Sequence, residues 1–487
     1  MLKSRQFTFL SLFPYSFPVF LGLGLGFLVA RGDWLYALGL ALLVPLAILF
    51  SSRPFVGVIL WLVLMPLSSA LPNPEMMYWV IHRGLIPFTL CMTIFPYLIN
   101  PSKMPHFRMN LPDVCIALLA VYVPISLLLS GMEIRQPLIK YIDRMFIPFC
   151  MYLIVRLTVT RLVELQSFQW TAFFIASSQS MISFIAQFAP YYLPYAWRPL
   201  LQGYAAGSLI NPNLFVIALG FCICILFQAA MDQKSGLVRT IFIAMSGVSV
   251  IGIFLSMERA AWLAGALILV GLFWLYPKIM LRFLIISAVL LLFLGELFFS
   301  KYASRVADRI NNQGTIYDRI VVTDAMFQMI QVKPIFGWGY DSLNNHIENY
   351  YRQVGDASGN IRFTTSHNTY LTIFTELGLV GFLLYMLPML WLLVMSFRVW
   401  RGILKIEPTR RFMLATLWLA TLNIFVISNF IDMRFFPIGL TLWWLNLGLI
   451  ANILNRQHEI YDKFSTKISW QAHDETISHD NLGLVNG

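Results

Sequence analysis

Three side chains in the C-terminal half of the chain could carry out proton transfer and anion binding. His367 lies where a polar stretch becomes apolar, and we expect it in the first turn of a helix, with Ser366 or Thr365 as the cap. The positive end of a helix disfavours a second positive charge, so the imidazole there should be neutral and able to accept a proton. Arg259 and Arg319 stand near the starts of two other expected helices. A guanidinium stays charged and presents a planar fork of donors, which suits phosphate oxygens.

Each of these residues also has an ordinary structural explanation. Arg259 could be an interfacial arginine whose head reaches water, and Arg319 could lie on a solvated helix surface. Arg319 near a helix N-terminus would oppose the macrodipole, however, which is reasonable where an anion lies. His367 could simply hydrogen-bond the helix start, with Asn368 as the more conventional partner. Glu376 follows His367 by nine residues and is about half a turn out of phase, so it could instead satisfy a neighbouring helix.

The polar stretch before His367 carries the signals of a helix and a turn. Thr315 and Asp318 have the spacing of a capping box, and apolar residues then recur at helical spacing until Pro334. The residues of this apolar pattern are Ile320, Val321, Met326, Phe327 and Ile330. A glycine-rich turn that presents aromatic residues follows at Pro334–Ser342. The chain becomes apolar again at Ser366–Leu371.

The composition determines the class of protein that positions these residues. Of the 487 residues, 59% are hydrophobic and 12% are charged, whereas a soluble chain has roughly a quarter charged residues. The formal charge of +11 comes without a basic, aromatic-rich polar stripe, so we expect no nucleic acid partner and assign the charge to cytoplasmic loops. The five cysteines lie in or beside apolar runs, which argues against disulfides and a thiolate metal site. Cys222 and Cys224 should pack, His346 should be an ordinary loop histidine, and His82 and Arg83 should be interface anchors.

The sequence therefore predicts an all-α polytopic membrane protein with about 12–14 transmembrane helices. Fourteen apolar runs are candidates: Phe7–Ala30, Trp34–Phe50, Phe55–Ala70, Gly84–Ile99, Leu111–Ser130, Tyr141–Val155, Phe168–Ala189, Leu214–Ala230, Leu237–Ser256, Ala260–Tyr276, Leu281–Phe299, Thr369–Phe397, Phe412–Phe430 and Phe435–Leu454. The first run is too long for a signal peptide and should be retained. We divide the chain into N-terminal transmembrane helices (1–200), a transmembrane core with the large outer loop (201–454, loop 300–368) and a polar tail (455–487).

Basic residues alternate between the two sides of this arrangement. With the N-terminus in the cytoplasm, one set of connections holds Lys3, Arg5, Arg53, Lys103, Arg108, Arg156, Arg161, Lys234, Arg239, Lys278, Arg282, Arg398, Arg401, Lys405, Arg410 and Arg411, and the tail adds Arg456, Lys463 and Lys467. The opposite connections are poorer in Lys and Arg. By the positive-inside rule we expect both termini in the cytoplasm and Lys301–Ser366 outside it.

The motifs of this chain resemble those of the O-antigen ligase and polysaccharide polymerase superfamily of bacterial envelopes. The matching elements, in order, are Gly207-x-x-x-Asn211-Pro-Asn213, Ser256-x-x-Arg259, Arg319, Pro334-x-x-Gly337-x-Gly339, His367-Asn368-x-Tyr370-Leu371 and Glu376-x-Gly378-x-x-Gly381. Members often carry a basic residue just before the Gly of the Asn-Pro-Asn element, where this chain has Tyr204, Ala205 and Ala206. The nearest outer arginine is Arg198.

The resemblance implies an integral inner-membrane enzyme that transfers a glycan from an undecaprenyl-diphosphate carrier to an acceptor hydroxyl outside the cytoplasm. Arg259 and Arg319, with Arg198 as a third member, would hold the donor diphosphate, and His367 would be the base. Asn368, Tyr370, Glu376, Asn211 and Asn213 would support them. The sequence shows no nucleotide-binding fingerprint and no metal-ligand spacing, so we expect no cofactor and no metal.

The sequence does not identify the acceptor, and it is compatible with other classes of membrane protein. The acceptor could be lipid A core or a protein, as for a ligase, or a growing glycan on the carrier, as for a polymerase. A polysaccharide or lipid transporter or flippase is the alternative from another class; it would need a second copy of the Asn211-Pro212-Asn213 motif in an inverted half, which the sequence lacks. A structural membrane scaffold would leave the ordered motifs unexplained.

The predicted orientation can be tested with reporter fusions. A reporter joined after Gly236 or Pro408 should report the cytoplasm, and one inserted within 355–360 should report the outside. A cytoplasmic reading within 355–360 would place the motifs opposite an extracytoplasmic donor and would end the catalytic interpretation.

Overall fold

The computed structural model describes residues 13–71, 73–100, 109–158, 162–198, 204–311, 314–351, 366–403 and 408–455. All the regular elements of these ranges are helices, and one stands at each of the fourteen predicted positions. They are α1 (Phe13–Ala30), α2 (Trp34–Ser52), α3 (Phe55–Leu64), α4 (Pro74–Tyr78), α5 (Leu85–Ile99), α6 (Leu111–Leu129), α7 (Arg135–Tyr141), α8 (Ile147–Leu157), α9 (Leu162–Phe188), α10 (Pro212–Asp232), α11 (Gly236–Leu255), α12 (Arg259–Leu275), α13 (Pro277–Asn311), α14 (Gly314–Val332), α15 (Leu343–His346), α16 (Thr369–Ile403), α17 (Pro408–Ser428) and a last helix, Pro437–Asn455. The polar tail and residues 1–12 lie outside the described ranges.

The lengths and compositions of these helices confirm an all-α polytopic membrane protein. Six helices of the described ranges are long and apolar enough to cross a bilayer: Pro74–Ile99, Leu111–Leu129, Pro212–Asp232, Gly236–Leu255, Thr369–Trp400 and Pro437–Asn455. Four shorter apolar helices accompany them: Ala37–Ser52, Phe55–Ala70, Arg259–Leu275 and Phe412–Ser428. Helices α4 and α5 join through a π-helical turn at Trp79–Gly84, and α7 and α8 join through another at Ile142–Phe146.

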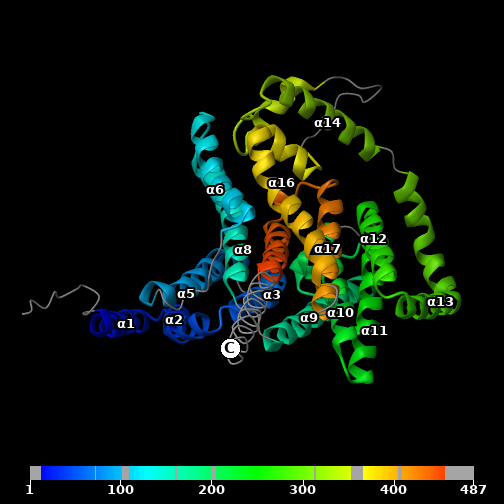
Figure 1. Ribbon diagram of the computed structural model, residues 1–487, viewed down its shortest axis with the longest axis horizontal. Helices are drawn as coiled ribbons and strands as arrows, with labels where there is room; N and C mark the ends of the chain where they lie inside the picture. The colour runs from blue at the N-terminus through cyan, green and yellow to red at the C-terminus, as the bar shows by residue number, and fades with distance from the viewer. Residues whose placement is uncertain are drawn as a thin grey trace, which may run out of the picture.

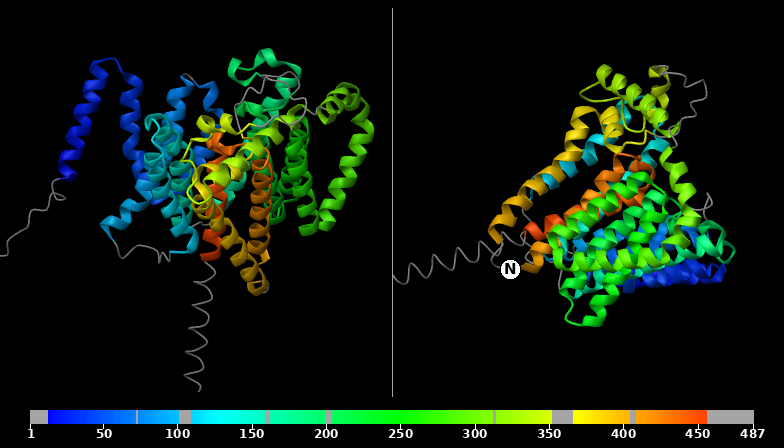
Figure 2. Two further views of the ribbon diagram at one scale, coloured as in Figure 1. Left: turned by 90° about the horizontal axis from the view of Figure 1, so that it is seen from above. Right: turned by 90° about the vertical axis from the view of Figure 1, so that its right-hand side faces the viewer.

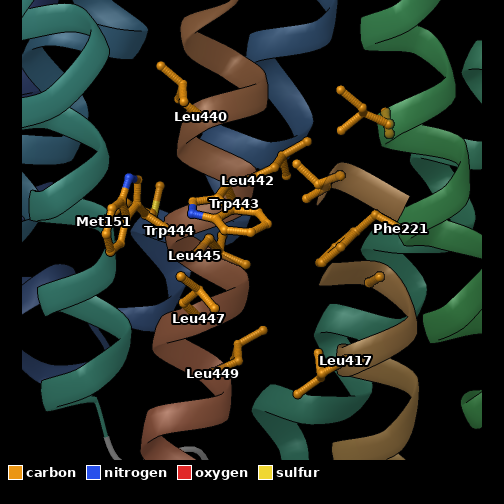
Figure 3. Close-up of a cluster of buried hydrophobic side chains, with 14 of the residues drawn as sticks. Met151, Phe221, Leu417, Leu440, Leu442, Trp443, Trp444, Leu445, Leu447 and Leu449 are labelled. Carbon is orange, nitrogen blue, oxygen red and sulfur yellow. The ribbon is translucent and has the colours of Figure 1, made fainter. Parts of the chain in front are cut away.

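Helix α10 and the last helix form the centre of the bundle. Almost every residue of α10 after Asn213 is buried, including Cys222 and Cys224, as expected for a helix that is apolar on all sides. Trp444 of the last helix is fully buried and packs edge-to-face on Phe149 at 4.9 Å between ring centroids. Figure 3 shows how side chains from α8, α10, α17 and the last helix meet here. The buried cluster includes residues from Phe55 to Leu454, so helices from α3 to the last helix share one core, whereas α14 packs in a separate cluster.

The predicted outer segment (residues 300–368) is more helical in its described part than its composition indicates. Helix α13 does not end at the predicted Phe299 but continues to Asn311. The helix predicted from Ile316 to Pro334 is confirmed as α14, and α14 lies beyond the ends of α6 and α16 (Figures 1 and 2). The side chains of the Thr315 and Asp318 capping box lie outside the described set.

The predicted apolar face of α14 is partly wrong. Ile320 and Phe327 are exposed at 47% and 52%. Val321, Met326 and Ile330 are buried as predicted. Val322, Ala325 and Met329 join Met326 on the face that packs on Leu343 of α15 and Ile347 of the turn after it. Packing against α15 and the turn after it shifts the buried face around α14 by part of a turn. The periodicity of α14 alone does not show where these partner elements lie.

Helix α16 breaks at the Glu376-x-Gly378 motif. Gly378 has φ 64° and ψ −169°, which interrupts the α-helical hydrogen bonds from the amides of residues 379 and 380 to the carbonyls of residues 375 and 376. The Pro334–Gly339 segment satisfies all four groups: Trp338 N to Thr375 O (3.2 Å), Gly339 N to Glu376 O (2.8 Å), Leu379 N to Pro334 O (2.8 Å) and Val380 N to Ile335 O (3.2 Å). The Tyr122 hydroxyl of α6 also donates to the Leu377 carbonyl at 2.9 Å. The glycine-rich turn is therefore docked against the broken helix through its backbone.

The glycines of this contact are required by space and by conformation. A Cβ on Gly378 would lie 2.3 Å from Ile335 O, and a Cβ on Gly337 would lie 2.3 Å from Glu376 O. Both glycines also have positive φ, 64° and 70°, which disfavours any residue with a Cβ. No side-chain rearrangement can relieve these contacts, because the opposing atoms belong to the backbone.

We predict that Gly378→Ala destabilises the protein by at least about 2 kcal/mol, since it combines positive φ with a backbone clash. Thermal unfolding in detergent checks this. Gly39→Ala is the matched control, because Gly39 lies in α2 and a Cβ added there would have no neighbouring atom within 4 Å. The control should be neutral or slightly stabilising. Equal unfolding temperatures for Gly378→Ala and wild type would show that the break is not needed for stability.

Candidate active site

His367 lies just before α16 rather than within its first turn. The helix begins at Thr369, and Asn368 caps it: the Asn368 Oδ1 accepts from the Leu371 amide at 2.9 Å. The predicted cap by Ser366 is therefore wrong, and Thr365 lies outside the described residues. An asparagine side chain reaches the third amide of a helix directly, which displaces the start of the helix by two residues beyond His367. His367 is half-buried and has a left-handed φ of 54°.

Ser366 and Thr369, which flank His367 and Asn368, are both anchored to the connection between α17 and the last helix. The Thr369 hydroxyl donates to Ile431 O at 2.8 Å and accepts from the Met433 amide at 2.8 Å. The Ser366 hydroxyl lies 3.3 Å from the Asp432 carboxylate. Both hydroxyl-bearing residues are buried. The turn that carries His367 is thus held from both ends.

Glu376 binds the glycine-rich turn and a residue that the sequence did not predict. Its carboxylate accepts from the amides of Asp341 (2.8 Å) and Leu343 (3.3 Å) and forms an ion pair with Arg434. Glu376 and Arg434 are 1% and 3% exposed. Sequence analysis missed Arg434, although the pair of charges at Asp432 and Arg434 between two apolar runs was a signal that could have identified it.

Asp341 extends the charged contacts to the N-terminal helices. Its carboxylate lies 2.6 Å from the Lys140 ammonium and 3.4 Å from the Arg144 guanidinium. The neighbouring Tyr340 is fully buried and packs edge-to-face on Tyr141 at 6.4 Å, and its burial raises the pKa of the phenol well above its usual value. The aromatic residues of this turn are therefore only partly presented to solvent.

His346 belongs to the packing of the outer segment. Its ring lies 4.7 Å from that of Trp338, whose indole also faces the Lys333 ammonium at 4.1 Å. Partial burial and the Lys333 charge lower the pKa of His346, so it is neutral at neutral pH. This arrangement suits a packing histidine.

The structure places the start of α14 and the start of α16 at the same end of the bundle. Arg319 is half-buried and precedes Val322 by one turn, and Val322 belongs to the cluster on which Leu371 of α16 packs.

Arg259 is the first residue of α12 and follows Met257, which has a φ of 55°. A hydrogen bond from the Ala205 amide to Leu255 O (3.0 Å) joins the end of α11 to the segment before α10.

The remaining predicted residues have mainly structural contacts. Asn211 caps α10, accepting from the amides of Asn213 (2.9 Å) and Leu214 (3.3 Å). Tyr370 is buried and packs on Phe425 at 5.0 Å. Arg198 is exposed, and its guanidinium donates to two carbonyls of the preceding turn, Leu193 O (3.2 Å) and Tyr191 O (3.3 Å). Its assignment to a diphosphate remains a prediction.

The arrangement combines an imidazole at a helix start with arginines at two other helix starts. Across the described ranges, no three His, Cys, Asp or Glu side chains gather in the geometry of metal ligands. The chemistry available from these side chains is proton transfer together with the binding of an anion.

Comparison with protein families gives a match between residues 244–386 and the family described as O-Antigen ligase. The matched stretch begins in α11 and ends within α16, so it contains Arg259, Arg319, His367 and Glu376. Arg198, the Asn211–Asn213 element and Arg434 lie outside it. A search of curated proteins gives no match.

Proposed function

Because this chain belongs to the O-antigen ligase and polysaccharide polymerase superfamily, we propose that it moves a glycan from a polyprenyl-diphosphate carrier to an acceptor hydroxyl. The family makes it a glycan transferase of the membrane in general terms. The carrier, undecaprenyl diphosphate, and the extracytoplasmic side of the inner membrane are the finer parts of the proposal. The observation that carries it is the location of His367 and Arg319 at one end of the bundle: His367 lies just before α16, and Arg319 lies in α14, which packs on α16.

In the proposed reaction the acceptor oxygen attacks the anomeric carbon of the donor glycan. The bond between that carbon and the diphosphate oxygen breaks, and the lipid diphosphate leaves with the bonding electron pair. The acceptor proton passes to the neutral imidazole of His367. The donor brings its own activated bond, so the reaction needs no nucleotide outside the cytoplasm.

Arg259 and Arg319 are proposed to bind the diphosphate and to stabilise the charge of the leaving group. Each stands at or near the N-terminus of a helix, where backbone amides add to the positive potential. With two guanidiniums in this role, we expect transfer without a metal ion. His367, just ahead of the amides of α16, is favoured in its neutral form by the same helix-end potential.

The acceptor determines whether the chain acts as a ligase or as a polymerase. A ligase would use lipid A core or a protein, and a polymerase would use a second carrier-linked glycan. The lipid-linked glycans of a deletion strain distinguish the two: long carrier-bound chains indicate a missing ligase, and single repeat units indicate a missing polymerase.

We predict that the Arg259→Ala, Arg319→Ala double variant loses transfer because the diphosphate loses both guanidiniums. Arg319→Lys should not restore activity, since an ammonium does not reproduce bidentate contacts. The measurement is transfer of a purified lipid-linked glycan, with excess chelator present throughout. Arg282→Ala, an exposed arginine of α13, is the control and should transfer at the wild-type rate. Wild-type turnover by a folded double variant would remove both arginines from the site.

We predict that His367→Gln and His367→Asn fold and bind the donor but transfer glycan about a hundredfold more slowly, the usual effect of a lost base. If His367 only supplied a hydrogen bond near the helix start, either amide would replace it. His346→Gln is the matched control from the same outer segment and should keep its activity. Near-normal transfer by His367→Gln would end the assignment of His367 as the base.

A further inference from the structure

Arg434 is a buried cation in the short connection between α17 and the last helix. Its guanidinium is 3% exposed and binds Asp432 through Nε (3.0 Å to Oδ1) and Nη2 (2.7 Å to Oδ2). Its third nitrogen, Nη1, pairs with Glu376 of α16. A buried charge is tolerated only when it is paired and hydrogen-bonded, and here both carboxylates are required to satisfy one planar fork.

The Asp432 side of Arg434 determines where the His367 turn lies. Asp432 accepts from the Arg434 side chain and also lies beside the Ser366 hydroxyl. The residues on either side of Asp432, Ile431 and Met433, bind the Thr369 hydroxyl. Movement of Arg434 would therefore move the two residues that bracket His367.

The Glu376 side of Arg434 determines where the glycine-rich turn lies. Glu376 accepts from the Asp341 and Leu343 amides, and Asp341 in turn binds Lys140 and Arg144. Three cations, Lys140, Arg144 and Arg434, are thus connected with three carboxylates, Asp341, Glu376 and Asp432. The glycine-rich turn follows α14, so its position fixes the exit of the helix that carries Arg319.

We propose that Arg434 is a positioning residue, which sets the distance between the imidazole of His367 and the diphosphate held by Arg319. This role rests on the proposed function, because it assumes that His367 is the base and Arg319 a donor ligand. Arg434 itself touches neither substrate. It acts through two rigid contacts, one to the turn that bears the base and one to the turn that follows the anion-binding helix. A planar fork with fixed geometry can hold both at once, whereas an ammonium on a flexible stem cannot.

Arg434→Lys tests the proposal, because it keeps the charge and removes the fork. We expect kcat to fall about tenfold to a hundredfold, the effect of a displacement on the order of 1 Å. The KM for lipid-linked donor should change by less than about twofold if the diphosphate site itself is intact. Arg156→Lys is the matched control: Arg156 is 4% exposed and pairs with Asp113 at 3.4 Å in another part of the bundle. The control should lower stability without lowering kcat.

The decisive measurement repeats Arg434→Lys in the His367→Gln background. A residue that acts by placing the base has nothing further to remove once the base is gone, so the second substitution should change kcat by less than about twofold. A residue that only supports folding would reduce the active fraction equally in both backgrounds. An equal loss in the two backgrounds, or no loss in either, would overturn the positioning role.

Thr369→Val provides an independent variant if Arg434→Lys does not yield folded protein. It keeps the shape of the side chain and removes the hydroxyl that binds Ile431 and Met433, so it should show the same loss of kcat and the same dependence on His367. Unchanged kcat in Thr369→Val would overturn the proposal. Absence of transfer by the wild-type protein with every donor tried would instead contradict the proposed function. The two failures are thus distinguishable.

Discussion

The α-helical hydrogen bonds of α16 are interrupted at Gly378, and the position of the glycine-rich turn depends on how the freed groups are satisfied. Unpaired amides and carbonyls cost several kcal/mol each in a bilayer, where water does not replace their partners. The Pro334–Gly339 segment supplies the four missing partners. This segment therefore contacts a transmembrane helix as a backbone-paired part of the bundle. This constraint explains why residues 337 and 378 are both glycine.

The charged side chains around this break form the second layer of the same contact. Glu376 accepts from the turn that is docked at Gly378 and pairs with Arg434. Asp341 connects the turn to Lys140 and Arg144 in the N-terminal half. Three positive and three negative groups meet, so the charges of the buried members, Arg144, Glu376, Asp432 and Arg434, are compensated where single charges would be unfavourable. The N-terminal helices, which carry none of the motifs between Gly207 and Gly381, thus help to hold the glycine-rich turn.

The sequence predicted the helices well and their contacts less well. Hydropathy located a helix at every predicted run, and Pro334 marked the end of α14, because these signals are local. The sequence indicated Asn368 only as an alternative partner for the start of α16, because serine and asparagine are both favoured at the N-cap position. Arg434 could not be connected with Glu376 from the sequence, because 58 residues separate them. The break in α16 was also hidden, since a glycine in an apolar run does not reveal whether another backbone approaches it.

In the proposed function, a diphosphate binds at the end of the bundle where α12, α14 and α16 begin. An experimental structure with undecaprenyl diphosphate bound would test this directly. We expect the diphosphate oxygens to lie about 3 Å from the guanidinium nitrogens of Arg259 and Arg319, on the same face as the His367 ring. A diphosphate bound at the other end of these helices, with no contact to Arg259 or Arg319, would contradict it.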